Sequence, residues 1–176
     1  MNILNLHGFL GAADNRNYNA LKCFLPDTVI LSPNLREAYQ SEPPRDLLER
    51  LTAMTDDETV LVGQSLGSWY ANQLSLRTGR PCVITNPAYF PHKLPLITDL
   101  VPEEFAAEYE ELTDLRCNPA AVSLCADADT LLPGNIENCE RFSAQVIRVH
   151  GGHSGIEDLD VHLKAAFEAA GIRFTE

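Results

Sequence analysis

A serine stands between two glycines in the run Gly63-Gln64-Ser65-Leu66-Gly67. The apolar residues before this run predict a buried strand, and the residues after it predict a helix. A Gly-x-Ser-x-Gly run in that context is typical of a nucleophile elbow, where a strained backbone projects the serine hydroxyl above a sheet. Glycines are required because larger side chains at either position would collide with the neighbouring strand or helix. The alternative is that Ser65 only caps the helix.

A serine hydroxyl becomes a good nucleophile only when a base accepts its proton, so a histidine is required. We expect this base to be His153, in the glycine-rich stretch Gly151-Gly152-His153-Ser154 between the last predicted strand and the last predicted helix. A loop at that position lets an imidazole reach over the strand ends toward Ser65. His150, at the end of the same predicted strand, is the main rival.

The acid that orients the histidine is expected at the end of the preceding strand. Two aspartates, Asp127 and Asp129, follow that strand. We favour Asp129, because Asp129-Thr130-Leu131-Leu132-Pro133 has the Asp-x-apolar-apolar-Pro pattern that often carries this acid. Asp127 is then a turn residue or a hydrogen-bond partner. Serine, acid and histidine would follow one another along the chain in the order known for such elbows.

Two backbone N–H groups are candidate donors to an oxyanion formed at Ser65. The first belongs to Leu66, at the start of the predicted helix. The second belongs to Phe9, with Leu10 as the alternative, because the first predicted strand ends in His7-Gly8 and the loop after it usually supplies this donor. His7 is interpreted as a structural residue that bonds the loop backbone rather than as a base.

The elements that must position these groups alternate between short apolar runs and amphipathic stretches. The predicted strands are Ile3–Leu6, Thr28–Leu31, Thr59–Val62, Cys82–Thr85, Val122–Cys125 and Gln145–Val149. The predicted helices are Tyr18–Phe24, Arg45–Met54, Ser65–Thr78, Ile136–Ser143 and Leu159–Ala170. Most of the strands are continuous apolar runs, which is typical of strands covered on both faces. The alternation predicts an α/β fold with about six mostly parallel strands and helices on both faces.

One segment, residues 88–119, interrupts this alternation. Prolines gather where it begins, at Pro87, Pro91 and Pro95, and an acidic helical pattern follows over Pro102–Leu115. Proline followed by glutamates favours a helix start. Long excursions in compact domains are often lids or binding loops, so the segment is either a small cap or rim over a pocket or a plain surface helix.

Size and charge limit the classes of protein to consider. The 176 residues predict one domain over 1–176, and the net charge of −12, with basic residues scattered singly, disfavours binding to nucleic acid or to a membrane surface. Neither a membrane-spanning run nor a signal peptide is found, so we expect a cytoplasmic protein. The five cysteines lack Cys-x-x-Cys spacing, and we expect free thiols rather than a zinc site.

Taken in order, these residues resemble a known family. Leu6-His7-Gly8-Phe9, the run around Ser65, Asn86-Pro87-Ala88, Asp129-Thr130-Leu131-Leu132 and Gly151-Gly152-His153 look like the motifs of the YqiA-like esterases. These are compact bacterial members of the α/β-hydrolase superfamily with a minimal cap. The resemblance covers residues 3 to 168, and it departs at Ala128-Asp129-Thr130, where the family commonly has Gly-Asp-Glu, and at Ser154, where an apolar residue is more common.

The resemblance implies esterase activity on short acyl esters without a cofactor, with Ser65, Asp129 and His153 as nucleophile, acid and base. The expected partner is thus a small-molecule ester. A thioesterase or amidase would use the same triad. A binding protein on a hydrolase fold is a further alternative, although it would have no need of the three groups in order. A nucleotide-binding regulator is disfavoured, because the loop after the first strand lacks the spacing of a phosphate loop.

Overall fold

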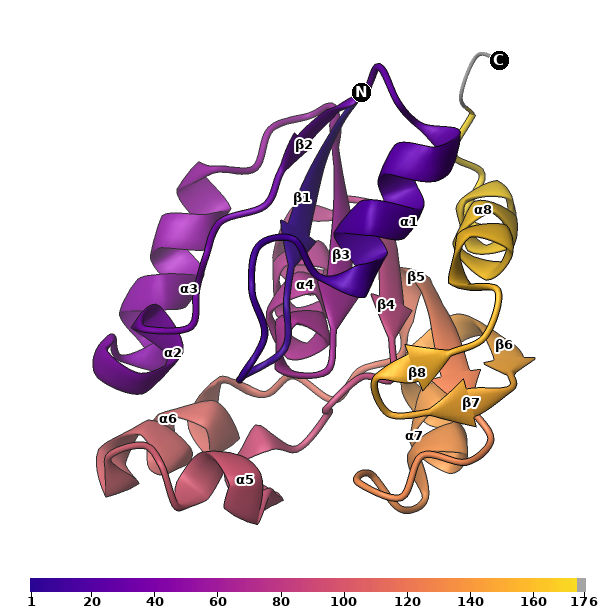
Figure 1. Ribbon diagram of the computed structural model, residues 1–176. Helices are drawn as coiled ribbons and strands as arrows, with labels where there is room; N and C mark the ends of the chain where they lie inside the picture. The colour runs from indigo at the N-terminus through magenta and orange to yellow at the C-terminus, as the bar shows by residue number, and fades with distance from the viewer. Residues whose placement is uncertain (174–176) are drawn as a thin grey trace.

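The computed structural model describes residues 1–173, and its centre is a sheet of six parallel strands in the order β2-β1-β3-β4-β5-β6. Figure 1 shows the strands running in one direction, so that their carboxyl ends meet at one edge. The strands are β1 (Asn2–Leu6), β2 (Val29–Leu31), β3 (Thr59–Gln64), β4 (Cys82–Thr85), β5 (Asn118–Ala126) and β6 (Ser143–Val149). The predicted α/β fold with six parallel strands is confirmed.

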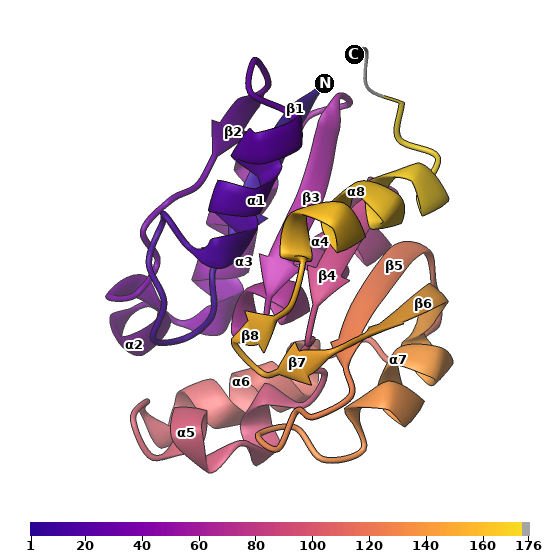
Figure 2. The same cartoon turned by 45° about the vertical axis from the view of Figure 1, so that its right-hand side comes forward.

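Helices cover both faces of this sheet, as predicted. One face carries α1 (Arg16–Phe24) and α8 (Leu159–Ala169), which contact each other. The other face carries α3 (Pro44–Ala53), α4 (Leu66–Thr78) and α7 (Asn135–Phe142), and Figure 2 shows α8 in front of the sheet with α4 behind it. Alternate residues of a strand enter opposite cores, so that Ile3 packs with Leu21 and Phe167 while Leu4 packs on the side of Trp69.

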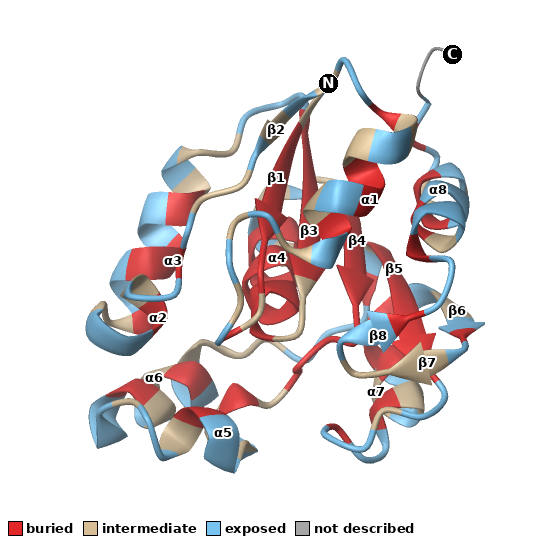
Figure 3. Cartoon of the chain, in the orientation of Figure 1, coloured by how far each residue is buried: buried red, intermediate tan, exposed pale blue. Residues whose placement is uncertain are grey.

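The central strands are buried as their apolar sequences predict, and Figure 3 shows them mostly in red. Cys82 and Cys125 are also core residues. The edge strand β2 differs, because Val29 and Leu31 are exposed despite their apolar side chains. A strand at the edge of a sheet has a neighbour on one side only, and its sequence alone does not reveal this position.

Helix boundaries lie within two residues of the predicted ones, except at the segment 88–119. The predicted end of α4 is confirmed, since Gly79 has a positive φ of 71° and its N–H donates to the carbonyl of Ser75. The predicted helix over Pro102–Leu115 is shorter, with α6 spanning Glu103–Leu112. The hydroxyl of Thr113 bonds the carbonyl of Tyr109 and also accepts from the indole N–H of Trp69, and the chain turns there toward β5.

The first part of the segment, residues 88–112, lies beyond the carboxyl ends of the strands (Figure 1), whereas residues 118 and 119 already belong to β5. Besides α6, the segment contains a short 3-10 turn (Pro91–Lys93) and α5 (Pro95–Thr98). Another short helix, α2 (Ala38–Ser41), lies earlier in the chain, before α3. The Tyr109 hydroxyl on α6 lies 3.0 Å from the Tyr70 hydroxyl on α4. This buried contact fixes α6 to the core beside α4, the helix that follows Ser65. A role of the segment as a cap remains a prediction.

No helix within residues 1–173 combines the length and the apolar character needed to span a bilayer. In the same residues no three His, Cys, Asp or Glu side chains are grouped so that they could hold a metal ion.

Candidate active site

Ser65 lies at the turn between β3 and α4 with φ 52° and ψ −116°, a backbone conformation that is costly for a residue with a side chain. Hydrogen bonds on both sides hold it there. Its N–H donates to the carbonyl of Thr85, and its carbonyl accepts from the N–H of Ala88. Ser65 occupies the N-cap position of α4, but its side chain makes no capping hydrogen bond to the helix, so helix capping does not explain the serine.

The two glycines of the elbow are needed for the reason the sequence suggested. A Cβ atom at Gly63 would lie 2.5 Å from the carbonyl oxygen of Gly67. A Cβ atom at Gly67 would lie 2.1 Å from the carbonyl oxygen of Leu6 on the neighbouring strand. Both contacts involve backbone that cannot move aside, so the tight approach of α4 to β1 and β3 requires glycine.

Ser65, His153 and Asp129 form one continuous hydrogen-bonded row. The Oγ of Ser65 lies 2.9 Å from Nε2 of His153, and Nδ1 of His153 lies 2.8 Å from Oδ2 of Asp129. The imidazole is largely buried and the carboxylate is 2% exposed. The structure therefore brings together the three side chains that the sequence proposed as nucleophile, base and acid.

Asp129 is held in place by more than the histidine. Its Oδ1 accepts hydrogen bonds from the N–H groups of Leu131 and Leu132, at 3.0 and 3.1 Å. Burial by itself would raise the pKa of Asp129, but the hydrogen bond and charge of His153 and these two N–H groups outweigh it and lower the pKa below its usual value. An ionised Asp129 accepts a hydrogen bond from the Nδ1–H of His153, which leaves Nε2 unprotonated and able to accept a hydrogen bond from Ser65.

The rival residues form a second pair that does not reach Ser65. Nδ1 of His150 lies 2.6 Å from Oδ2 of Asp127, and the two side chains are 85% and 45% exposed. Oδ1 of Asp127 also accepts from the N–H of Gly151. This bond ties the start of the loop that carries His153 to the end of β5. The sequence interpretation of Asp127 as a hydrogen-bond partner agrees with this contact.

His153 sits in the turn of a small hairpin that the sequence indicated only as a glycine-rich loop. The hairpin pairs β7 (Gly151–Gly152) with β8 (Gly155–Ile156) in antiparallel register. Gly151 has φ 131°, and a Cβ atom there would lie 2.2 Å from the carbonyl oxygen of Gly155. His153 and Ser154 form the two-residue connection between the two short strands.

The loop after β1 passes directly beside the nucleophile. A Cβ atom at Gly8 would lie 3.3 Å from Cβ of Ser65. Within residues 1–173 the N–H groups of Phe9 and Leu66 donate to no protein acceptor. The Leu10 side chain is exposed, whereas the Phe9 ring is buried and stacks on Tyr39.

His7 holds this loop, as the sequence suggested. Its Nδ1 donates to the carbonyl of Gly8 at 2.7 Å, and its Nε2 accepts from the N–H of Leu35 at 2.8 Å. The bond at Nε2 requires the neutral imidazole, because a protonated Nε2 has no lone pair to accept the N–H of Leu35. Burial is the main reason that the pKa of His7 is lowered from its usual value.

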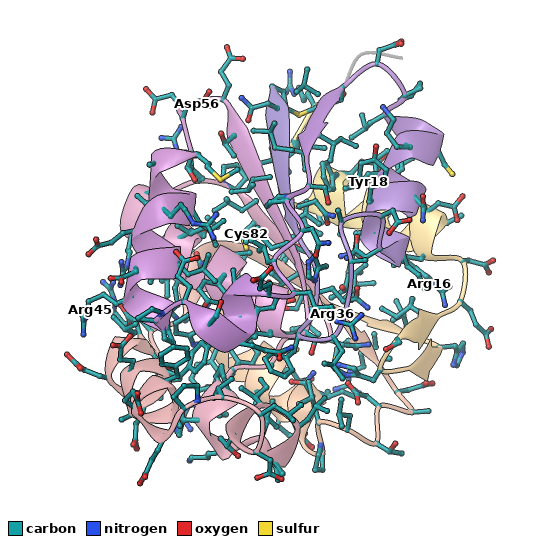
Figure 4. All side chains as sticks on the ribbon, turned by 60° about the vertical axis from the view of Figure 1, so that its left-hand side comes forward. Arg16, Tyr18, Arg36, Arg45, Asp56 and Cys82 are labelled. Atoms are coloured by element: carbon teal, nitrogen blue, oxygen red, sulfur yellow. The ribbon has the colours of Figure 1, made fainter. Side chains whose placement is uncertain are left out.

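Sequence reasoning missed two residues that contact the histidine hairpin. The side-chain amide of Asn86, at the end of β4, donates to the carbonyls of Gly152 and His153. Arg16, at the start of α1, donates to the carbonyls of Ser154 and Ile156, and Figure 4 shows its side chain reaching from α1 toward the C-terminal part of the chain. For Asn86 the available signal was an asparagine directly before a proline at a strand end. Asparagine tolerates positive φ, so such a residue indicates a special turn.

A pocket of about 190 Å³ lies beside the row. Its walls are the mostly apolar residues 87–90, Leu94, Leu132 and Pro133, with Lys93, Asn135 and Asn138 as the polar members. Two of its walls are bonded to the row, since Ala88 donates to the carbonyl of Ser65 and Leu132 donates to Asp129. No residue of the hairpin or of the loop after β1 lines it.

Solved structures with the same fold are found among α/β hydrolases. A protein from Xanthomonas campestris pv. campestris assigned to the α/β-hydrolase superfamily shares 23% identity over 96% of this chain and 95% of its own, with a TM-score of 0.61. A structure from work on LipS and LipT, two metagenome-derived lipolytic enzymes, shares 14% over 98% and 94%, with a TM-score of 0.71. The RedJ thioesterase of prodiginine biosynthesis in Streptomyces coelicolor shares 16% over 94% and 90%, with a TM-score of 0.59.

These identities are low, and the likeness shows the fold. A family model described as an uncharacterised protein family, UPF0227, matches residues 2–117, which include Ser65 and end before Asp129 and His153. With about two-thirds of its length matched, the chain belongs to the uncharacterised protein family UPF0227 and has the fold of the α/β-hydrolase superfamily.

Proposed function

We propose that this protein is a serine hydrolase of the carboxylesterase type, which cleaves small acyl esters through an acyl-enzyme intermediate. One observation carries the proposal, the unbroken row Ser65–His153–Asp129 with contacts of 2.9 and 2.8 Å. These side chains come from three separate loops. The fold itself does not require His153 and Asp129 to meet a serine with strained backbone. Names of similar folds, a lipolytic enzyme and a thioesterase among them, support the same reaction class.

In the first step Oγ of Ser65 attacks the ester carbonyl carbon while its proton passes to Nε2 of His153. Asp129 keeps the proton of Nδ1 in place and stabilises the imidazolium that forms. The carbonyl oxygen becomes an oxyanion, which the N–H groups of Phe9 and Leu66 stabilise. A single good donor of this kind contributes about 3 kcal/mol to the transition state.

The tetrahedral intermediate then collapses. Nε2 of His153 gives its proton to the alcohol oxygen, the carbon–oxygen bond of the ester breaks, and the acyl group remains on Ser65. A water molecule attacks the acyl carbon and passes a proton to Nε2. When the bond to Oγ breaks, that proton returns to Ser65 and the free acid leaves, so that the cycle consumes one ester and one water.

The pocket beside the row sets the size of the acyl group. An engineered cavity of about 150 Å³ in another protein binds benzene, so a pocket of about 190 Å³ accepts a group of roughly six carbons. The alcohol oxygen must lie near Nε2 of His153, yet no residue of the hairpin lines the pocket. The acyl half is therefore placed in the pocket, and thioesters or amides would use the same machinery with other leaving groups.

Labelling with a fluorophosphonate probe tests the proposal. We expect the intact chain to react and the Ser65→Ala variant to remain unlabelled. Ser154→Ala is the matched control, because Ser154 neighbours His153 and is exposed to the probe but its hydroxyl makes no contact in the row. Parallel hydrolysis rates of a butyryl oxyester, thioester and anilide then rank the three leaving groups. An intact, folded chain that does not react would be a binding protein on a hydrolase fold.

A further inference from the structure

The hairpin that carries His153 has little structure of its own. Its two strands pair only through Gly151 with Ile156 and Gly152 with Gly155. Isolated two-stranded hairpins are at best marginally stable, and three of the four paired residues are glycines, so that Ile156, which is buried in the core, is the one that adds side-chain packing. The position of the imidazole relative to Ser65 must therefore be set by contacts from other elements.

Asn86 supplies the buried half of these contacts. It follows β4 directly and is 0% exposed. Its Nδ2 donates to the carbonyl of His153 at 2.8 Å and to the carbonyl of Gly152 at 3.2 Å, while its Oδ1 accepts from the N–H of Ala126 at 2.8 Å. One amide thus joins the backbone of His153 to the end of β5, the strand that leads to Asp129.

The backbone of Asn86 is itself fixed next to the nucleophile. Its N–H donates to the carbonyl of Leu124 at 2.9 Å, and its φ is 42°, in the left-handed region. The preceding residue, Thr85, accepts from the N–H of Ser65. The same short segment therefore holds Ser65 through Thr85 and His153 through the side chain of Asn86.

Only asparagine fits all of these demands. Aspartate would keep the acceptor toward Ala126 but would turn a carboxylate toward two carbonyl oxygens. Glycine would keep the positive φ but would lose every side-chain bond. Asparagine combines one donor group, one acceptor group and tolerance of left-handed backbone in a short side chain.

Arg16 holds the hairpin from the solvent side. It donates to the carbonyl of Ile156 at 2.7 Å and to that of Ser154 at 3.2 Å. Four hairpin carbonyls, those of residues 152, 153, 154 and 156, are thus bound by two side chains. Because Asn86 bonds His153 itself and is buried, it fixes the imidazole more directly than Arg16 does.

We propose that Asn86 is a positioning residue for His153, which holds the base at hydrogen-bond distance from Ser65 during turnover. The inference rests on the proposed hydrolase function. A displacement of a catalytic group by about 1 Å can lower the rate about 100-fold, because proton transfer requires close and aligned partners. Substrate binding in the pocket involves neither Asn86 nor the hairpin, so the effect falls on kcat rather than on KM.

The test compares Asn86→Gly and Asn86→Asp with the intact chain, with active sites counted by fluorophosphonate titration. We expect kcat per active site on a butyryl ester to fall about 100-fold in both variants, with KM changed less than about threefold. We also expect the downfield proton resonance of His153 Nδ1–H to shift or broaden. Asn86→Asp keeps the side-chain volume and the bond to Ala126, so it still tests the inference if the Asn86→Gly variant folds poorly.

Asn118→Gly is the matched control. Asn118 is a second buried asparagine whose amide donates to Asn72 and accepts from the N–H of Ala120, at the opposite end of β5. The Asn118→Gly variant should lower Tm about as much as Asn86→Gly does, and it should leave kcat per active site unchanged. An unchanged kcat in both Asn86 variants, or an equal fall in Asn118→Gly, overturns the inference while labelling of Ser65 still upholds the hydrolase. An intact chain that is never labelled instead refutes the hydrolase itself.

Discussion

Asp127 and Asp129 are separated by one residue, yet the first is 45% exposed and the second 2% exposed. The chain leaves β5 at Ala126 and turns between them, so that Asp127 faces His150 at the surface and Asp129 faces His153 in the interior. The two aspartate–histidine pairs have similar hydrogen-bond geometry. Only one of them continues to Ser65.

The two aspartates should therefore respond very differently to substitution by asparagine. Asp129→Asn should lower kcat by about 10³- to 10⁴-fold, because the neutral amide no longer holds the tautomer with its proton on Nδ1. Asp127→Asn should leave kcat within about threefold of the intact chain. Steady-state hydrolysis of a butyryl ester measures both, and equal small losses would show that neither aspartate orients the base.

Acid should destabilise the protein partly through His7. Burial lowers the pKa of His7 in the folded chain, whereas the unfolded chain has the usual value of about 6.5. As pH falls below about 6.5, the unfolded state takes up a proton that the folded state does not, and the free energy of unfolding decreases. Thermal unfolding of the intact chain between pH 7.5 and 5 should show this fall.

The His7→Gln variant should be less stable at pH 7.5, but its Tm should change less over the same pH range. His162→Gln is the control, since His162 lies on α8 far along the chain from the loop after β1. A Tm profile of His7→Gln parallel to that of the intact chain would exclude His7 as the source of the pH dependence.

Substitution of the elbow glycines should disrupt the fold and not only the reaction. Gly67→Ala places a methyl group 2.1 Å from the carbonyl oxygen of Leu6, so α4 must separate from β1. We expect a loss of at least about 3 kcal/mol in the free energy of unfolding, measured by urea denaturation. Gly152→Ala is the control for stability, because a Cβ atom there meets nothing nearer than 3.8 Å. A Gly67→Ala variant as stable as Gly152→Ala would contradict this packing.

Filling the pocket beside Ser65 should shorten the acyl chains that are accepted. Leu94 lines this pocket and is half-buried, so Leu94→Trp should narrow it without opening the core. We expect the ratio of kcat/KM for hexanoyl over acetyl esters to fall about tenfold or more. Leu100→Trp is the control, because Leu100 is exposed on the same segment and does not line the pocket.

If Leu94→Trp instead changed the ratio of kcat/KM between esters of long and short alcohols that share one acyl group, the alcohol half would lie in the pocket. Leu94→Trp and Leu100→Trp with identical chain-length profiles would show that the pocket does not bind substrate.

Much of the fold and part of the site follow from local sequence. Continuous apolar runs such as Val60–Val62 predict strands covered on both faces, and the observed sheet agrees because burial on both faces leaves no polar positions in such a strand. Gly63 and Gly67 predict the tight turn at Ser65, since only glycine allows the backbone to approach so closely. These conclusions depend on stereochemistry within a few residues.

The partners of Ser65 were a different matter. The sequence contains two aspartates and two histidines with nearly equal spacing. Asp129 was favoured by the pattern Asp-x-apolar-apolar-Pro, and His153 by its glycine-rich loop. Which pair points inward depends on the turn after β5, which bonds the carbonyls of Val149 and Gly151, and on the hairpin, which Asn86 and Arg16 hold. Such contacts join residues far apart in the chain, and their signal in a single sequence is one asparagine before a proline.

The sequence by itself thus determined the tight turn at Ser65, the glycines around it and the parallel sheet, because each follows from local backbone geometry or apolar periodicity. The tertiary structure alone decided that His153 lies 2.9 Å from Ser65, 88 residues earlier in the chain, and that His150 does not. Hydrogen-bond geometry between distant segments requires the packed sheet to exist first, since only the aligned carboxyl ends of β3, β5 and β6 bring the three loops together.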